Sequence, residues 1–338
     1  MATQRKFANL GEFALAVRRA AETRGDPDPR LAVQAATLTT TSSEGVGADG
    51  GYLANPEVRA DVVAAILSET SLLARTDRVT TTRNAVVIPA NAAPAWLGGP
   101  LPTLEKEAEV LGQVKPVVQS RTARLVKIQA TVPCSNELFE DALGLDAYLR
   151  QAVGARIDFA VTNHLINGDG VNKPLGILNS PALITQTKEG AQGAGTVVYA
   201  NLQKMWSRLW GPSKSRAIWL LHSSVEQALQ GLTLPAGVLT YPADSPYGFL
   251  FGRPMLLTEA CQTVGTPGDV ILCDPLAILT ATRPGEVRED LSLHCMWDLD
   301  VALFRFTMRL GALPWWASTV TQLHGSGTVS SAVVLEAR

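Results

Sequence analysis

The sequence predicts an α+β fold, and three patterns carry this prediction. Residues 145–166 place apolar side chains at the spacing of one buried helical stripe. Residues 79–88 and 115–132 are rich in Val and Thr and partly alternate, as strands do. In the second half of the chain, helical and strand-like segments follow one another. A chain of 338 residues can hold one large core or two smaller ones, so we expect two subdomains.

The composition of the first 54 residues predicts an extended arm and not a separately folded core. A short amphipathic helix is expected over residues 10–21, and a stretch rich in Thr, Ser and Gly follows at 37–51. Such a composition buries too little apolar surface to fold alone, but it can become ordered against a neighbour. Pro56 then stands at a favourable first-turn position for a helix that runs to about residue 70.

The two strand-like segments predict an extended hairpin. Between them, residues 89–114 contain Pro, Gly and charged residues and would form its tip. Trp96 lies on this otherwise polar tip, which makes it a candidate anchor against another protein. Ser135 is expected to cap a short helix that ends at Gly144.

The long helix is expected to end in a glycine-rich turn. Its stripe consists of Leu145, Tyr148, Leu149, Val153, Ile157, Ala160, Val161 and Leu165. The turn contains Gly168, Asp169, Gly170, Pro174 and Gly176. Glycine stops a helix and proline redirects the chain. His164 precedes the turn, where a cation would suit the helix dipole.

The second half of the chain predicts an α/β subdomain. Helices are expected over 201–210 and 223–231, with a strand over 217–222 between them. Ser223 is the expected N-cap of the second helix, and Glu226 would complete a capping box. The tail from residue 301 to 320 alternates as a strand does.

Composition argues against several classes of function. Lys plus Arg number 29 and Asp plus Glu number 31, so there is no basic excess for gripping nucleic acid. No apolar run approaches the ~18 residues of a membrane span. The cysteines are scattered without paired spacing, and reduced thiols that pack as small apolar groups are expected. They are Cys134, Cys261, Cys273 and Cys295. The four histidines show no metal-ligand spacing, so we predict no metal and no cofactor.

Three patterns could indicate chemistry, and each has a simpler structural interpretation. Residues 45–50 match a dinucleotide-binding fingerprint, but a Thr/Ser run stands where the strand should be, so an arm is preferred. His222, Ser223 and Ser224 could supply a base and a nucleophile, but a helix cap explains Ser223. The acidic cluster at 137–141 fits a solvated or intersubunit face.

Four short motifs follow one another in a fixed order along the chain. They are Asp49–Pro56, Asn167–Ile177 (NGDGVNKPLGI), Leu250–Met255 and Gly268–Leu272. Together they resemble the major capsid proteins of tailed bacteriophages, over about residues 50–320. The resemblance implies the phage major capsid fold: an N-terminal arm, an extended E-loop hairpin, a P-domain with a long spine helix, and an α/β A-domain.

The resemblance also implies segment boundaries and contact residues. The segments are an arm at 1–54, the start of the P-domain at 55–80, the E-loop at 81–130, the P-domain with spine helix 145–166 at 131–198, the A-domain at 199–276, P-domain strands at 277–309, and a return to the A-domain with the C-terminal tail at 310–338. Intersubunit contacts would come from Tyr52, Leu53, Trp96, Leu97, Glu105, Lys106 and Glu107. Trp96 resembles the Trp of a family "WxGE" element, but Gly99 replaces the acid, so that ion pair is in doubt.

The function implied by the resemblance is structural and not enzymatic. Many copies would form pentamers and hexamers of an icosahedral head around double-stranded DNA, without sequence-specific binding and without a membrane. Partners would be further copies, a portal protein, and separate scaffolding and decoration proteins. The protein would assemble in the host bacterial cytoplasm and reside in the virion. Two alternatives stay open: an encapsulin-type nanocompartment, which shares the fold, and a soluble α/β enzyme.

Two further expectations concern processing and crosslinking. Only about fifty residues precede the Asp49 motif, so we expect no large N-terminal scaffolding segment to be removed. Some relatives join an E-loop lysine to a P-domain asparagine. Lys106 or Lys115 could supply the amine, but no asparagine follows Asn201, and Asp298 and Asp300 are poor electrophiles. We therefore expect shells without covalent crosslinks.

Overall fold

The computed structural model describes residues 71–91, 118–135, 145–243, 245, 248–296 and 301–338. Contacts within the chain divide it into two compact units. Among the described residues, unit 1 contains those within Lys127–Phe159 and Arg283–Arg309, and unit 2 those within Glu69–Val126, Ala160–Thr282 and Leu310–Arg338. The predicted arm, hairpin tip and short helix before Gly144 lie outside the described residues.

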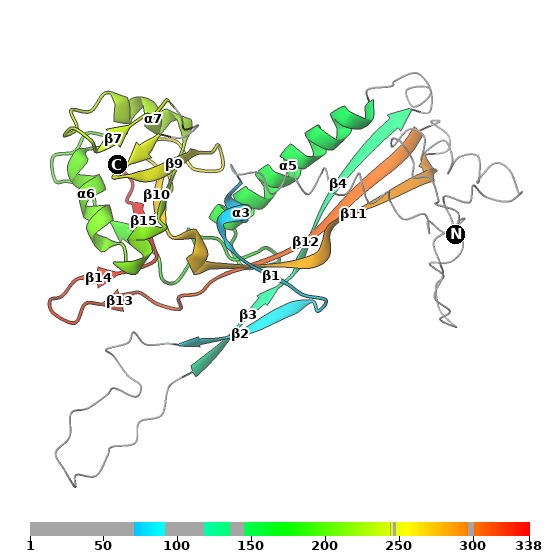
Figure 1. The fold of residues 1–338 in the computed structure, drawn as a ribbon, viewed down its shortest axis with the longest axis horizontal. Coiled ribbons are helices and arrows are strands. Elements are labelled where there is room, and N and C mark those ends of the chain that lie inside the picture. The colour runs from blue at the N-terminus through cyan, green and yellow to red at the C-terminus, as the bar shows by residue number, and fades with distance from the viewer. Residues whose placement is uncertain (1–70, 92–117, 136–144, 244, 246–247, 297–300) are drawn as a thin grey trace, which may run out of the picture. The chain divides into compact units, whose positions relative to one another are not determined.

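Unit 2 contains a seven-stranded sheet with the order β5-β15-β10-β6-β9-β8-β7. Figure 1 labels its strands β7, β9, β10 and β15. The strands are β5 (Ile184–Gln186), β6 (Ile218–Leu221), β7 (Leu239–Thr240), β8 (Phe249–Leu250), β9 (Arg253–Leu257), β10 (Val270–Cys273) and β15 (Ala332–Leu335). The pairs β5/β15 and β6/β9 are parallel, and the other pairs described here are antiparallel. The strands β6, β10 and β15 are buried along their whole length, which explains their continuous apolar sequences.

Helices α6 (Tyr199–Arg208) and α7 (Ser223–Gln230) pack on this sheet. Leu202 of α6 and Val225 of α7 belong to the same buried cluster as Trp219 of β6. The Trp219 indole Nε1–H donates to the carbonyl of Leu250 at 2.9 Å, so the large ring is buried without an unsatisfied donor. The predicted helices and the strand between them are confirmed, with ends shifted by one or two residues.

A four-stranded sheet has the order β1-β11-β12-β4. Its strands are β1 (Asp77–Thr80), β4 (Val126–Ser135), β11 (Ile278–Met296) and β12 (Val301–Pro314). Along β12 every second side chain from Ala302 to Leu310 is buried, which confirms the predicted alternation for this part, whereas the strand ends at Pro314 and not at the predicted residue 320. The long helix α5 (Leu145–Asn167) is confirmed within one residue of its predicted end, and Val153, Ile157 and Leu165 of its stripe are buried.

Two predicted strands are each broken in two. Residues 79–88 form β1 and then β2 (Ala85–Asn91), and residues 115–132 form β3 (Val118–Arg124) and then β4. The two interruptions lie opposite each other, since the backbone N–H of Leu125 donates to the carbonyl of Asn84 at 2.9 Å. The pairing partners change there: β1 pairs with β11, whereas β2 pairs with β3.

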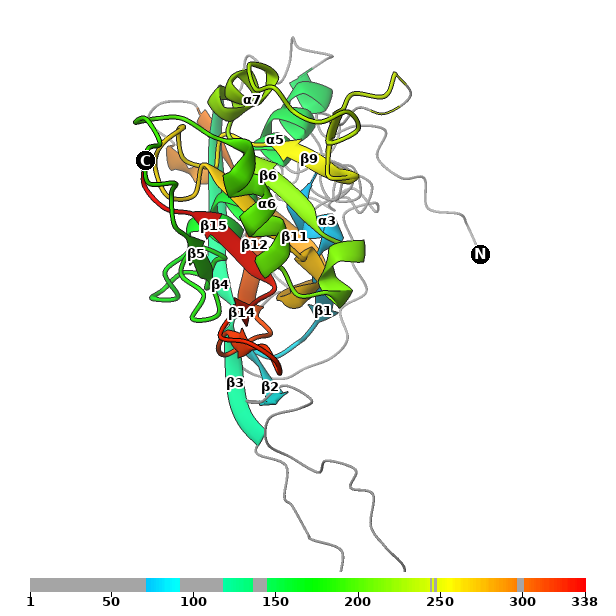
Figure 2. The same cartoon turned by 90° about the vertical axis from the view of Figure 1, so that its left-hand side faces the viewer.

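The remaining elements are short, and Figure 2 shows β14 among them. They are α3 (Leu72–Arg75), η2 (Pro212–Ser215), η3 (Pro275–Ala277), β13 (Val320–Thr321) and β14 (Thr328–Val329). None of the described helices combines the length and the apolar character that crossing a membrane requires. Cys134, Cys261 and Cys273 are buried free thiols, as predicted, and burial raises the pKa of Cys261 to about 12.

Candidate functional site

The turn after α5 is held by hydrogen bonds on both of its sides. The N–H groups of Ile177 and Leu178 donate back to the carbonyls of Leu165 and Ile166 at 2.8 and 3.0 Å. The Asn179 side chain donates to the carbonyl of Gly168 at 2.9 Å. The last carbonyls of the helix therefore receive partners from the chain that leaves the turn.

Two glycines of the turn allow this close approach. A Cβ at Gly168 would collide with the carbonyl oxygens of Pro174 and His164. A Cβ at Gly176 would lie 2.6 Å from both the nitrogen of Gly168 and the carbonyl oxygen of Ile166. Because these neighbours are backbone atoms, they cannot rotate away. Packing therefore requires glycine at positions 168 and 176, whereas at position 170 glycine is favoured by a φ of 78°.

The outer part of the turn is exposed and polar. Asp169 accepts the N–H of Val171 at 2.9 Å, and Asn172 adopts a φ of 54°. Val171 is 70% exposed at the tip. The cation expected at His164 is not supported, because burial, followed by the charge of Lys173, lowers the pKa of that imidazole, although Asp169 opposes the shift.

The inner part of the turn contacts the base of the β2–β3 hairpin. The N–H of Leu175 donates to the carbonyl of Ala312 in β12 at 3.1 Å. The Leu175 side chain packs against a buried cluster that contains Ile88 of β2 and Ala123 of β3. The motif that the sequence singled out therefore joins the end of the long helix to β12 and to the hairpin.

The β2–β3 hairpin has one covered face and one exposed face. Seven antiparallel pairs run from Ala85↔Arg124 to Asn91↔Val118, which confirms the predicted hairpin for its described part. Ile88 is buried on one face, whereas Val87 is 63% exposed on the other.

In unit 1, Asp290 of β11 lies between two arginines. It accepts from Arg288 at 2.9 Å and from Arg305 at 2.7 Å, and its side chain is 17% exposed. Burial opposes ionisation of this carboxyl, but the two arginines overcome that effect and lower its pKa.

We expect Asp290→Asn to destabilise the subunit by about 1 kcal/mol at neutral pH, since both arginines stay half exposed. A carboxyl whose pKa is lowered on folding stabilises above its unfolded pKa of about 4, and this contribution disappears as the pH falls through the folded pKa. Urea unfolding of wild type and variant should therefore differ at pH 7 and converge below about pH 3. Asp169→Asn, which removes an exposed carboxylate, is the control, and a pH-independent gap for Asp290→Asn would contradict the assignment.

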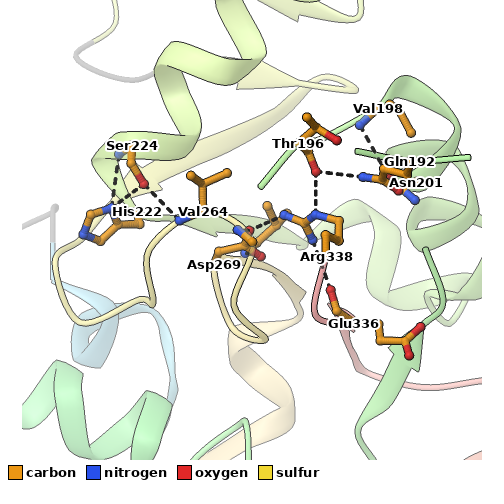
Figure 3. Close-up of polar contacts among 12 residues, drawn as sticks. Gln192, Thr196, Val198, Asn201, His222, Ser224, Val264, Asp269, Glu336 and Arg338 are labelled. Atoms are coloured by element: carbon orange, nitrogen blue, oxygen red, sulfur yellow. Dashed lines mark hydrogen bonds and ion pairs between the residues drawn. The ribbon is translucent and has the colours of Figure 1, made fainter. Parts of the chain in front are cut away.

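A second polar cluster surrounds the start of α7 (Figure 3). His222 Nδ1 accepts the N–H of Ser224 at 3.1 Å and lies 2.8 Å from its hydroxyl, while His222 Nε2 lies 2.9 Å from the Glu259 carboxylate. The hydroxyl of Ser224 also accepts the N–H of Val264 at 3.1 Å. Every one of these contacts either caps α7 or holds the loop after β9 against it.

The predicted cap at Ser223 is therefore wrong. His222 has the extended backbone of an N-cap, and its ring nitrogen accepts the bond that a serine oxygen usually takes. Ser223 instead donates to Glu259 at 2.7 Å, and Glu226 accepts from the hydroxyl of Tyr241 at 3.1 Å. Because the Glu259 side chain is 64% exposed, the Ser–His–Glu contact lacks the desolvated environment of a catalytic triad.

A third cluster, also in Figure 3, centres on Arg338 and Asp269. Both side chains are fully buried and form an ion pair. Asp269 also accepts the N–H groups of Gly265 and Val270 at 2.9 and 2.7 Å. Burial raises the pKa of the Asp269 carboxyl, and Gly265 and Arg338 oppose that rise. Arg338 further donates to the carbonyl of Thr196 at 2.6 Å, so the cluster ties three distant segments together.

The structure tests only part of the predicted site. The contact candidates Tyr52, Leu53, Trp96, Leu97, Glu105, Lys106 and Glu107 lie outside the described residues, and so do the side chains of Leu145 and Leu149. The predicted turn residues Gly168, Asp169, Gly170, Pro174 and Gly176 lie together in the turn after α5. The pairing of Asp269, which lies in the Gly268–Leu272 motif, with Arg338 was not predicted from the sequence, because the two residues are 69 positions apart. Among the described residues, no group of acidic, Cys and His side chains could hold a metal ion.

Comparison with known proteins identifies the family to which the chain belongs. The model of the phage capsid family matches residues 50–315, which is most of the chain. The chain belongs to the phage capsid family. It is therefore a capsid shell protein, a structural component of a virion capsid. A comparison with curated protein sequences gives no significant match.

Solved structures of other capsid shells share the fold of this capsid protein. The capsid of an empty GTA particle, computed with C5 symmetry, has 18% identity and a TM-score of 0.61, with 88% of this chain and 100% of that chain covered. A Microbacterium phage Oxtober96 structure has 13% identity and a TM-score of 0.54, with 80% and 91% covered. The holo-SrpI encapsulin complex from Synechococcus elongatus has 13% identity and a TM-score of 0.54, with 80% and 88% covered. At these identities the likeness shows the phage capsid fold.

Proposed function

We propose that this capsid protein assembles into pentamers and hexamers of an icosahedral phage head that encloses double-stranded DNA. The family match over residues 50–315 carries the proposal. The C5 symmetry of the similar GTA capsid supports five-fold contacts. The balance of 29 basic and 31 acidic residues suits a shell that neither grips nor strongly repels its DNA.

The segments have distinct roles in this proposal. The arm at 1–54 and the E-loop at 81–130 contact neighbouring copies, the P-domain contains the spine helix, and the A-domain surrounds the symmetry axis. Trp96 and Leu97 anchor the E-loop, and Tyr52 and Leu53 anchor the arm. Shells of this kind use several contacts per subunit, and obligate interfaces often bury roughly 2,000–5,000 Å². A portal protein and separate scaffolding and decoration proteins complete the head in the host bacterial cytoplasm.

Electron microscopy of the purified, expressed protein tests the proposal. We expect closed particles whose reconstruction contains five-fold and six-fold capsomers. Particles recovered with nuclease-resistant DNA support a phage head. Particles that instead contain one folded protein cargo identify an encapsulin-type compartment, and a protein that stays monomeric under all assembly conditions contradicts both.

Deleting residues 91–113 should leave a soluble subunit that no longer forms shells. The deletion removes the hairpin tip but leaves Ile88 and Ala123 in their buried cluster. Assembly then loses the E-loop contacts, whereas folding keeps its core. Thermal unfolding and electron microscopy of wild type and deletion variant separate the two effects. Normal particles from the deletion variant would contradict an assembly role for the E-loop.

Mature shells should contain no covalent crosslinks between subunits. Lys106 and Lys115 offer amines, but no asparagine follows Asn201 to act as the acceptor. A lysine opposite a carboxylate would form an ion pair instead. Boiled, reduced particles should give one band near 36.0 kDa on a denaturing gel. A ladder of pentamer- and hexamer-sized species that survives boiling would contradict this prediction.

A further inference from the structure

The base of the β2–β3 hairpin contains an arginine in an unusual setting. Arg121 lies on β3 directly opposite Ile88, so both side chains belong to the covered face of the hairpin. Its Nη1 donates to two backbone carbonyls, that of Pro314 at 2.5 Å and that of Trp316 at 2.9 Å. One side chain of the hairpin therefore donates hydrogen bonds to two carbonyls that lie more than 190 residues away in the sequence.

The segment that accepts these bonds is itself fixed to unit 2. The N–H of Trp315 donates to the carbonyl of Ala277 at 2.9 Å, and its indole Nε1–H donates to the carboxylate of Asp77 at 3.1 Å. The ring of Trp316 packs edge-on against Trp210 with centroids 5.8 Å apart. Residues 314–316 form a fixed anchoring segment, so a side chain bound to them is fixed as well.

The other contacts at the hairpin base are mainly apolar. Among the described residues, the buried cluster beneath the hairpin consists of Ile88, Ala123, Leu279 and Leu313, and the partly buried Val79, Val86, Leu175 and Trp315 pack against it. Apolar packing is not directional, whereas two hydrogen bonds from one guanidinium group fix an angle. Pro314 is buried, so loss of Arg121 would also leave its carbonyl without this donor.

We propose that Arg121 is a positioning residue that locks the direction of the β2–β3 hairpin and thereby prepares it for docking on a second copy of this chain. The inference rests on the proposed shell assembly. A hairpin held in its bound direction before encounter loses less conformational freedom on docking than one that swings about its base. Val87 and the rest of the exposed face then present a constant surface to the neighbouring subunit.

Arg121→Met keeps the apolar part of the side chain and removes both donors. We expect the variant to fold. The backbone amides of residues 85–88, 90–91 and 118–124 should exchange with deuterium at least about tenfold faster, the factor expected from losing one charge-assisted hydrogen bond. Under conditions in which wild type forms shells, the variant should form none or irregular ones. Arg121→Lys can still donate and should lie between the two in both measurements.

The control is Arg124→Ala, three residues along the same strand on the exposed face. It should match wild type in hydrogen exchange, and it serves as a control for exchange alone, because Arg124 lies on the face proposed to contact the neighbouring subunit. Regular shells from Arg121→Met, or equal hydrogen-exchange rates in the Arg121→Met and Arg124→Ala variants, would contradict the positioning role of Arg121. If Arg121→Met does not fold, hydrogen exchange of the Arg121→Lys variant is the deciding measurement. Hairpin amides that exchange at the wild-type rate in that variant would contradict the positioning role of Arg121. If wild type itself never assembles, the proposed function fails, while the exchange comparison still decides whether Arg121 holds the hairpin.

Discussion

Gly168→Ala should destabilise the subunit by about 3 kcal/mol or more, because the added methyl group meets backbone that cannot move aside. The Cβ would collide with the carbonyl oxygens of Pro174 and His164. To relieve this collision, the end of α5 and the chain that leaves the turn would have to separate. That separation would break the bonds from Ile177 and Leu178 to the last carbonyls of the helix.

The effect should also reach the hairpin. Leu175 directly follows Pro174, donates to Ala312 and packs against the cluster that contains Ile88. A displaced turn would therefore loosen the cluster that supports the β2–β3 hairpin. We expect Gly168→Ala to lower both the unfolding midpoint in urea and the yield of shells.

Gly190→Ala is the matched control, since a Cβ there meets nothing within 4 Å. Its stability should change by less than about 0.5 kcal/mol, the usual range for a surface substitution. Equal unfolding midpoints for the two alanine variants would show that the turn tolerates a side chain. A Gly168→Ala protein that is recovered only as insoluble material would agree with the prediction, provided that Gly190→Ala is soluble.

Local patterns predicted the elements that depend on neighbouring residues. The helix α5 ends within one residue of its predicted limit because a continuous apolar stripe and a following glycine define it locally. The glycines of the turn were found for the same reason. The hairpin was predicted because a Pro- and Gly-rich stretch separates two strand-like segments, and its described base confirms the pairing.

The parts that were missed depend on distant residues. Both hairpin strands are interrupted where residues distant in sequence meet. Leu125 donates to the carbonyl of Asn84, 41 positions away along the chain, and Gly311 lies close to the carbonyl of Arg124. The cap of α7 was assigned to Ser223 because serine is the commoner capping residue, and Glu259, which bonds both Ser223 and His222, lies far away in sequence.

The turn between β8 and β9 shows the same limit. Phe251 has a φ of 51°, a conformation usually taken by Gly, Asn or Asp. Its ring stacks near Trp206 and Trp219, with centroids 5.7 and 6.1 Å away. The aromatic contacts compensate for the backbone strain, and a two-residue pattern of Phe-Gly does not reveal them.

Arg338→Met should cost about 3–5 kcal/mol, because removing one partner leaves the other as a buried, uncompensated charge. Both side chains of the pair with Asp269 are fully buried. Arg338 also donates to the carbonyl of Thr196, which would lose this donor. Urea unfolding of the unassembled subunit measures the loss. The control is Lys204→Met, whose pair with Glu189 is half exposed and should contribute less than about 1 kcal/mol.

A second substitution separates the charge from the packing. Asp269→Asn keeps an oxygen that can accept from Gly265 and Val270 but removes the negative charge. Combined with Arg338→Met, it eliminates both charges, so the double variant should be more stable than the sum of the two single losses implies. Strict additivity would mean that the two side chains do not interact, and a loss below about 1 kcal/mol for Arg338→Met would mean that the pair is hydrated in solution. A double variant that is more stable than the sum of the single losses implies would show that this ion pair stabilises the junction between residues 196, 265 and 338.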